Sequence, residues 1–513
     1  MKNAYIYIFI SLSILSYVHC AAQSETQTVD VDFTTVLSEG FQNNYGLRLQ
    51  NLTLEKDTYS VQQASGRLNP YIDFDVTKGT GIDPEVDNEG TEVFQSNLVI
   101  PTYLGIDLYT GVRRELTEQL DITSQSLHDD SSEFLLDGLG GWVGITMPLL
   151  QGLGKNSPVN VAIRTAKISQ EASGESLSNE VMIYFRDLLS AYLNLKRDVV
   201  QYGIQEKALL ESLKNKQSIY KLIENDNLPR SEKIRIDSQV LDQQQLLNTA
   251  ELNALDSYYS LRLLTGVKQK DLIHTVPRVS GGIPDPDIAK IEEMFSQYAT
   301  IDDSIIMMTP VYKNAALMSE AEKVELDFAE NQKLHKLDLD FKVSRFDNDG
   351  LTTIFNDNNL RSGMYPGTSE LLTLTYTLPL KNDEKKGAYL VQLAEYKTSK
   401  TQLSKLLFET KTGIQRGLVS LKQLLNLYKS NIDLVRDTRR SYEIEKEKFK
   451  LGRNTQIDVN LSFQDSYKAE LNRISIKFKI YSTMVQLKYL LGQLPSDDVQ
   501  LNNFSLEKYF ASY

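Results

Sequence analysis

Two long stretches of the chain show helical patterns of apolar residues. In 158–225 and in 385–450, apolar residues recur at heptad spacing, and neither stretch contains a proline after its first position. Sustained heptads predict coiled-coil packing, and each helix would be ~100 Å long. A break follows each stretch, and then a shorter return helix that ends at Gly266 or Gly492. Each pair therefore predicts an antiparallel helical hairpin.

Four shorter segments alternate with period two instead. Apolar and polar residues alternate strictly in 71–77 and 336–343, and apolar residues share one face in 142–149 and 372–378. Such strands have one apolar and one polar face. A water-soluble sheet would bury the apolar face in a core, whereas a transmembrane barrel would turn it to lipid and the charges to a wet lumen. The strands alone leave both interpretations open.

The barrel interpretation assigns individual side chains. Those expected to face lipid are Ile72, Phe74, Leu339, Phe341, Leu374 and Tyr376. Those expected to face water are Asp73, Asp75, Asp338 and Asp340.

The order of the elements repeats along the chain. A shift of 267 places Asp73 and Phe74 on Asp340 and Phe341, and a shift of 231 places Pro148 on Pro379. Helix-like segments at 33–66 and 311–334 precede the first strand of each half. We therefore expect two tandem structural repeats. The expected organisation is a signal peptide at 1–22, a first repeat at 23–266, a linker at 267–299, a second repeat at 300–492 and a C-terminal tail at 493–513.

The two halves differ in length between their strands. The distance from Phe74 to Pro148 exceeds that from Phe341 to Pro379 by 36 residues. This surplus includes 92–127. It either adds strands to the sheet or forms an extracellular flap.

The N-terminus has the features of a secretory signal peptide. A lysine at position 2 is followed by an apolar run up to Val18 and small residues up to Ala22. Cleavage after Cys20 or after Ala22 is possible. Acylation of Cys20 stays open, although His19 argues against it, because a lipoprotein signal has a small residue at that position. No other run is long enough to cross a membrane as a helix.

Composition narrows the function classes. The formal net charge is -13 without a basic block, which argues against nucleic acid as a partner. One cysteine and four scattered histidines exclude a disulfide framework and argue against a zinc site. Motifs for hydrolases, metalloproteases and phosphate loops are missing. We expect no enzyme, no cofactor and no metal.

Several short motifs occur in a fixed order. Pro148 to Gly154 has the form Pro-Leu-Leu-Gln-Gly-Leu-Gly, residues 449–459 read aromatic-x-x-Gly followed by Asp-Val, and 490–495 contain Leu-x-Gly-x-Leu. This ordered set resembles the TolC-type outer-membrane efflux protein family over about 30–495. One departure is that Asn225 to Asn227 stand where the first hairpin would have a tip glycine.

The resemblance implies a fold and a function. The expected fold is mainly α, with long antiparallel coiled-coil hairpins that form a periplasmic α-barrel joined to an outer-membrane β-barrel. A single chain offers four matched strands, which are too few to close a barrel, and open edges are not tolerated in lipid. A homotrimer would share twelve strands. The expected function is a passive exit duct for efflux or type I secretion, extending into the periplasm.

The expected partners are a periplasmic adaptor protein, an inner-membrane transporter and outer-membrane lipid. The alternative is a secreted or periplasmic structural coiled-coil protein without a pore. The sequence names neither the cargo nor the class of pump.

The resemblance also points to site residues. The expected adaptor-docking tips are Leu451, Gly452 and Arg453 in the second hairpin and Asn227, Leu228, Pro229 and Arg230 in the first.

The expected pore constriction is a ring of Asp458 side chains. Ile457 and Leu461 are four residues apart and are expected to share the packed stripe, which turns Asp458 toward the tunnel axis. The alternative is that Asp458 is a solvated charge favoured at a helix N-terminus.

Overall fold

The computed structural model describes most of the chain. The described residues are 29–83, 86–121, 132–225, 228–267, 273, 275–298, 302–353, 367–497 and 509. The predicted signal peptide with Cys20, the tip residue Asn227 and much of the tail lie outside them. The chain divides into two compact units. The first unit comprises 1–52, 175–313 and 405–513, and the second comprises 53–174 and 314–404.

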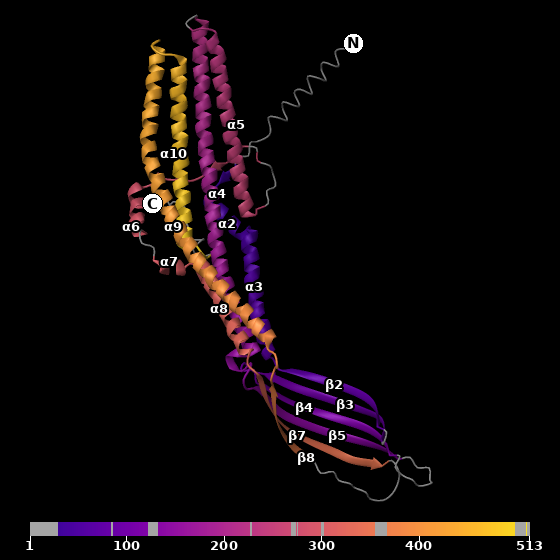
Figure 1. Ribbon diagram of the computed structural model, residues 1–513. Coiled ribbons are helices and arrows are strands. Elements are labelled where there is room, and N and C mark those ends of the chain that lie inside the picture. The colour runs from indigo at the N-terminus through magenta and orange to yellow at the C-terminus, as the bar shows by residue number, and fades with distance from the viewer. Residues whose placement is uncertain are drawn as a thin grey trace, which may run out of the picture. The chain divides into compact units, whose positions relative to one another are not determined.

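The second unit contains an antiparallel sheet of six strands. Its order is β2-β3-β4-β5-β7-β8 (Figure 1). The strands are β2 (Tyr71–Asp83), β3 (Val86–Pro101), β4 (Asp107–Asp121), β5 (Ser132–Pro148), β7 (Lys336–Thr353) and β8 (Gly367–Thr377). The four predicted strands are present as parts of β2, β5, β7 and β8, and each is longer than its alternating pattern.

Helices adjoin one end of this sheet. They are α3 (Tyr45–Ser65), α8 (Pro310–Asn331), the two 3-10 turns η1 (Gly66–Leu68) and η2 (Gly154–Asn156), and the first turns of α4 and α9. The connection from β5 to α4 passes through Gly152, which has a φ of 84°. The backbone N–H of Gly152 donates to Asn331 Oδ1 at 2.8 Å, so the turn is held by the end of α8.

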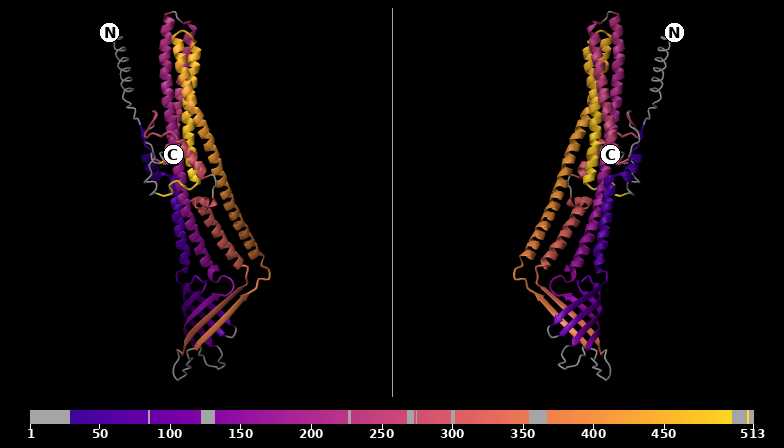
Figure 2. Two further views of the ribbon diagram at one scale, coloured as in Figure 1. Left: turned by 90° about the vertical axis from the view of Figure 1, so that its left-hand side faces the viewer. Right: turned by 90° about the vertical axis from the view of Figure 1, so that its right-hand side faces the viewer.

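The first unit is built around two helical hairpins. It contains α2 (Phe33–Asn43), α5 (Ser231–Thr265), α6 (Ile288–Gln297), α7 (Asp303–Met307) and α10 (Gln456–Leu490), together with the larger, C-terminal parts of α4 (Pro158–Glu224) and α9 (Asp383–Lys450). The short strands β1 (Asp30–Val31) and β6 (Arg278–Val279) pair in parallel. Figures 1 and 2 show α4 beside α5 and α9 beside α10. The return helices end at Gly266 and Gly492, with φ of 66° and 67°, as predicted.

The heptad residues form the core of this unit. The most deeply buried of them are Phe185, Leu188, Tyr192 and Leu195 on α4 and Ile414, Leu421, Leu425 and Tyr428 on α9. Return helix α10 adds Tyr481, Met484 and Val485 to the same cluster. Burying each such side chain contributes roughly 1.5–3 kcal/mol. The predicted coiled-coil seams are therefore confirmed in the middle of both long helices.

The segment 33–66 differs from the prediction of one helical stretch. It forms two helices, α2 and α3, separated at Asn44, whose ψ is 123°. The Asn44 side chain stabilises this break. Its Oδ1 accepts from the Leu47 N–H at 2.9 Å and its Nδ2 donates to the Leu264 carbonyl at 2.9 Å.

The surplus in the first half forms strands. Residues 86–101 and 107–121 are β3 and β4, so the added strand pair is found rather than a flap over the described part of 92–127. β2 pairs with β3 instead of β5. The sheet of one chain therefore has more strands than the expected four. The chain contributes six strands to its sheet.

Candidate functional site

One face of the sheet is apolar and exposed. Strand neighbours that lie directly opposite each other share a face, and the register places all six side chains predicted to face lipid together. The large exposed apolar side chains of this face are Ile72, Phe74, Val76, Phe94, Ile100, Leu108, Val112, Leu139, Val143, Phe341, Leu372, Leu374 and Tyr376. Phe74 is 77% exposed and Leu372 is 66% exposed. Soluble proteins rarely expose an apolar area of this extent without a partner or a membrane.

The opposite face is polar and internally hydrogen-bonded. Asp340 on β7 accepts hydrogen bonds from the Tyr109 hydroxyl at 2.9 Å and from Thr146 Oγ1 at 2.7 Å. The Lys342 ammonium lies 4.6 Å from the centroid of the Trp142 ring. The predicted water-facing carboxylates share this face.

The sheet has two edges. Among the described residues, β2 pairs only with β3 and β8 pairs only with β7. Each edge therefore presents backbone groups that can pair with another strand.

The tip of the second hairpin is a tight turn. Gly452 has a φ of 69°, its N–H donates to the Phe449 carbonyl at 2.9 Å, and the Arg453 N–H donates to the Lys448 carbonyl at 2.9 Å. This is a Schellman motif, in which a left-handed glycine ends the helix. Leu451, directly before it, is 66% exposed. The tip is therefore both a turn and an accessible surface.

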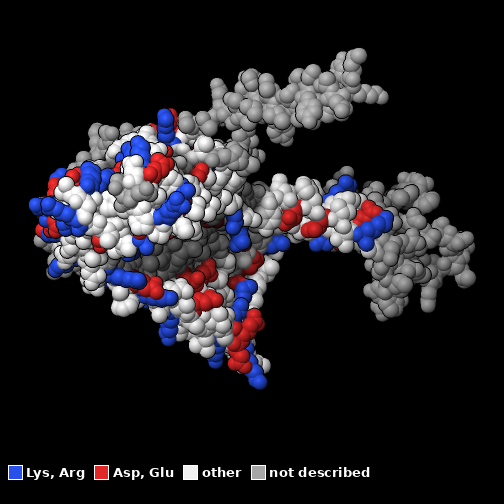
Figure 3. Space-filling model, turned by 90° about the horizontal axis from the view of Figure 1, so that it is seen from above, with Lys and Arg blue, Asp and Glu red and all other residues white. Residues whose placement is uncertain are grey.

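The two tips line one groove. Leu228 of the first tip and Gly452 of the second border a cavity of about 790 Å³. Most of its other lining residues come from α4, α9 and α10, and they include Ile219, Leu222, Phe449 and Val459. Pro229 and Arg230 are exposed beside it. Figure 3 looks down on this end and shows positive and negative side chains interspersed.

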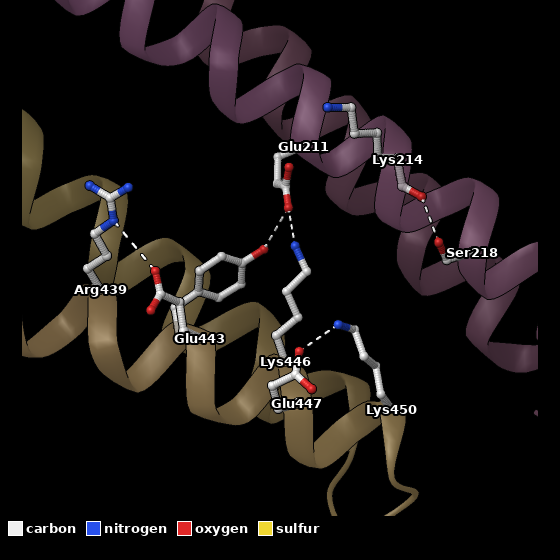
Figure 4. A network of polar contacts seen from close by, with 9 residues as sticks. Glu211, Lys214, Ser218, Arg439, Glu443, Lys446, Glu447 and Lys450 are labelled. Atoms are coloured by element: carbon white, nitrogen blue, oxygen red, sulfur yellow. Dashed lines mark hydrogen bonds and ion pairs between the residues drawn. The ribbon is translucent and has the colours of Figure 1, made fainter.

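A polar network joins the hairpins beside this groove (Figure 4). The Glu211 carboxylate on α4 accepts hydrogen bonds from the Lys446 ammonium and, at 3.2 Å, from the Tyr442 hydroxyl, both on α9. The hydrogen bond from Lys446 lowers the pKa of Glu211, and partial burial opposes it. Sequence reasoning missed this contact, because the partners lie 231 and 235 residues apart.

Asp458 lies in the first turn of α10. Its Oδ2 accepts from the Thr455 N–H at 3.0 Å and from Thr455 Oγ1 at 2.7 Å, while the Asp458 N–H donates to Thr455 Oγ1 at 3.4 Å. This is a capping box. The hydrogen bonds from Thr455, first from its side chain, lower the pKa of Asp458. Within one chain, Asp458 therefore has the contacts of a carboxylate that caps a helix N-terminus, which is the alternative to a pore-facing residue.

The packed stripe of α10 differs from the expectation. Val459 and Phe463 are 3% and 1% exposed, whereas Ile457 and Leu461 are 43% and 56% exposed. Within one chain, the packed stripe of α10 is therefore formed by Val459 and Phe463, and not by Ile457 and Leu461. The ring centroids of Phe463 and of Tyr442 on α9 are 5.4 Å apart, so the apolar series that starts at Val459 faces α9.

The described residues show neither a metal cluster nor a helix that could span a membrane. Within the described ranges, His, Cys, Asp and Glu side chains form no group of three that could hold a metal ion. In the same part of the chain, no helix has both the length and the apolar character that a membrane span requires.

The fold is found in solved structures. No protein-family model and no curated protein matches the chain. CusC, which forms a transmembrane channel, superposes with a TM-score of 0.64 at 10% identity, over 91% of this chain and 93% of the other. The CmeC outer membrane channel of Campylobacter jejuni gives 0.63 at 14% identity, over 93% and 90%. The chain has the fold of outer-membrane channels.

A third solved channel structure has the same fold. The open state of the MtrE outer membrane channel of Neisseria gonorrhoeae superposes with a TM-score of 0.58 at 14% identity, over 91% of this chain and 90% of that one. These likenesses confirm, at the level of the fold, the resemblance to TolC-type channels. All three are channels, in agreement with the expectation that the protein is not an enzyme.

Proposed function

We propose that the protein is an outer-membrane exit duct, a passive conduit for efflux or type I secretion. Three copies would share one β-barrel in the outer membrane, and their hairpins would form a tunnel in the periplasm. The observation that carries this proposal is the two-faced sheet, with an exposed apolar face, a polar face and two open edges.

In a lipid bilayer, the sheet must close so that its edge strands are paired. Unpaired backbone N–H and C=O groups cost several kcal/mol each in a bilayer, so the edges of β2 and β8 must find partners there. The two edges belong to different strands. A ring of copies that pairs β2 of one chain with β8 of the next therefore closes the sheet and leaves no edge.

The hairpins also support assembly. Leu427 and Leu434 on α9 are 56% and 48% exposed and seven residues apart, and Ile234 and Leu241 on α5 are 73% and 69% exposed with the same spacing. A heptad stripe that is exposed in one chain is a surface for packing against another helix. In the proposed trimer, these stripes meet helices of neighbouring copies.

The remaining partners follow from the same assembly. The exposed tips, including Pro229, Leu451 and Arg453, are the proposed contact with a periplasmic adaptor, which would connect the duct to an inner-membrane pump. The proposal retains the signal peptide at 1–22, the two tandem repeats at 23–266 and 300–492, and Cys20 as a possible site of acylation.

Planar lipid bilayers test this function. Detergent-purified protein should insert and give discrete ion-conducting steps, and the same protein denatured by heat should give none. Absence of conductance from correctly folded protein, together with solubility in buffer without detergent, would instead identify a structural coiled-coil protein without a pore.

A further inference from the structure

We propose that the hairpin of β3 and β4 widens the membrane barrel, so that three copies close eighteen strands rather than twelve. The proposal rests on the function proposed above and concerns the same conduit. It assigns to the duct an exit for bulky cargo. Six observations, all within the second unit, carry it.

The hairpin is long enough to cross a membrane. β3 has 16 residues and β4 has 15, whereas a tilted transmembrane strand needs about 9–11. β4 pairs continuously with β5 from Asp107 opposite Thr146 to Asp121 opposite Ser132. The added strands therefore extend along the full sheet.

Side chains fix β4 to the strands beyond it. The Tyr109 hydroxyl reaches across β5 to Asp340 on β7, at 2.9 Å from each carboxylate oxygen. Its ring lies over Gly144, where any Cβ would collide with it. On the other face, Thr110 Oγ1 donates to the Trp142 carbonyl at 2.8 Å. The hairpin is therefore an integral part of the sheet.

The turn between β3 and β4 is fixed as well. The Gly154 N–H donates to the Leu104 carbonyl at 2.9 Å, and Ser157 Oγ donates to the Tyr103 carbonyl at 2.8 Å. Gly105 has a φ of 77°, and a Cβ there would lie 2.6 Å from the Gly152 carbonyl oxygen. The turn docks on the connection between β5 and α4, so the hairpin has no free end on this side.

The apolar band continues across the hairpin with the tilt of a barrel. The register runs from Phe74 of β2 through Ser96, Val112, Gly141 and Arg345 to Thr368 of β8. The apolar run of β2 is centred on Phe74, but that of β8 is centred on Leu374, six residues beyond Thr368. Six residues are ~20 Å along a strand, and six strands span ~24 Å, so the band is inclined by ~40°. Closed membrane barrels tilt by about 35–45°.

Charged side chains on the apolar face lie beyond this band. They include Lys78 on β2, Glu92 on β3, Arg114 on β4, Arg345 on β7 and Glu370 on β8. All five lie past the apolar run in the direction away from the helices. Charge is costly in the middle of a bilayer and tolerated near its surface. Because β4 has the same sequence of apolar band and charge as β7 and β8, it fits the same membrane depth.

On the polar face, bulky aromatic side chains lie against the neighbouring strands. The Trp142 ring occupies the space where Gly111 has no Cβ, and the Phe346 ring occupies the space at Gly140. Aromatic rings lying over strand glycines fill the surface without projecting far from it. This arrangement suits a wide lumen.

Strand number sets the width. Strands ~4.8 Å apart and tilted by ~40° each occupy ~6.3 Å of circumference. Eighteen strands then close a barrel ~36 Å across between backbone atoms, and twelve close one ~24 Å across.

Cysteine pairs distinguish the two strand orders. In the structure, Asp73 lies opposite Asn97. In a four-stranded order, Asp73 would lie opposite Trp142, because these residues correspond in the repeat to Asp340 and Thr373, which pair in β7 and β8. Asp73→Cys with Asn97→Cys should form a disulfide in isolated outer membranes, and Asp73→Cys with Trp142→Cys should not. Single-cysteine variants control for the native Cys20.

Electron cryomicroscopy of the purified wild-type protein gives a second, independent measurement. A trimer with a barrel ~36 Å across is expected. A trimer with a barrel ~24 Å across, or a disulfide between positions 73 and 142 alone, overturns the widening and leaves the exit duct standing. A protein that forms no membrane-inserted oligomer overturns the proposed function itself.

Discussion

Glu211 on α4 and Lys446 on α9 form an ion pair between the two helical hairpins (Figure 4). Tyr442, one turn before Lys446, donates to the same carboxylate at 3.2 Å. The pair lies beside the groove that both hairpin tips border. Separation of the tips therefore requires that this contact break.

Removing the carboxylate should loosen the tips. Glu211→Gln replaces an ion pair between half-buried groups, worth about 1 kcal/mol, and should shift a closed-to-open equilibrium roughly fivefold toward open. Single-channel recording would show a higher open probability. Glu443→Gln is the matched control, since Glu443 pairs with Arg439 within α9 at 3.8 Å. Equal open probabilities for the two variants would contradict a role for the link between hairpins.

The same link predicts a pH dependence. The hydrogen bond from Lys446 holds the pKa of Glu211 below its ordinary value of 4.5. A carboxyl group with a lowered pKa stabilises the linked state above its ordinary pKa, and that stabilisation is lost as pH falls through the lowered value. Open probability should stay constant from neutral pH down to about 4.5 and rise below it. Glu211→Gln should abolish this rise, and an unchanged rise would assign it to another group.

The charge of Asp458 can be separated from its capping role. If Asp458 lines the pore constriction, Asp458→Asn should lower cation selectivity, because a ring of carboxylates attracts cations. Thr455→Val is the matched control, because it removes the partner of the capping box and keeps the carboxylate. Reversal potentials in a salt gradient measure selectivity. The same small change in both variants would show that Asp458 acts only as a helix cap.

A substitution at the tip glycine, Gly452, tests whether the hairpin tip docks on the adaptor. A Cβ at Gly452 meets no atom within 4 Å, so Gly452→Trp adds a bulky exposed side chain at a backbone cost of about 1 kcal/mol. It should abolish transport while trimer and membrane insertion persist. Gly281→Trp is the control, since Gly281 has a φ of 77° and the same open surroundings away from the tips. Full transport by the Gly452 variant would mean that the tip is a turn only.

The two faces of β2 should respond differently to charge. Phe74→Arg places a cation on the apolar face and should cost ~2–4 kcal/mol, with a corresponding loss of trimer. Asp75→Arg, next along the strand and on the polar face, should cost little. Asp340 is a poorer control because it accepts from Tyr109 and Thr146. Similar trimer yields from both β2 variants would disprove the assignment of faces.

The helices and the tips could be predicted from the sequence. Heptads such as Ile414, Leu421 and Tyr428 mark the seam directly, and Gly452 marks the turn. The strands of 71–77 and 336–343 were also evident, since their alternation is strict. These features depend on local periodicity, which a single sequence contains.

The added hairpin was not evident, for a physical reason. In β3 and β4, apolar residues such as Val99 and Tyr109 occupy the polar face, so the alternation is broken. The useful indication was length, because 86–121 matches the 36-residue surplus. The stripe of α10 that packs within the chain was not evident, because the pair Ile457 and Leu461 and the pair Val459 and Phe463 both have helical spacing and only tertiary contacts choose between them. The contact between Glu211 and Lys446 depends on tertiary packing, which no local pattern encodes.

Electrophoresis of outer-membrane fractions tests the central claim most directly. We expect the protein to sediment with outer membranes, to migrate as a trimer when left unheated in mild detergent, and to migrate as a monomer after boiling. A protein recovered from the soluble periplasmic fraction as a monomer under both conditions would contradict it.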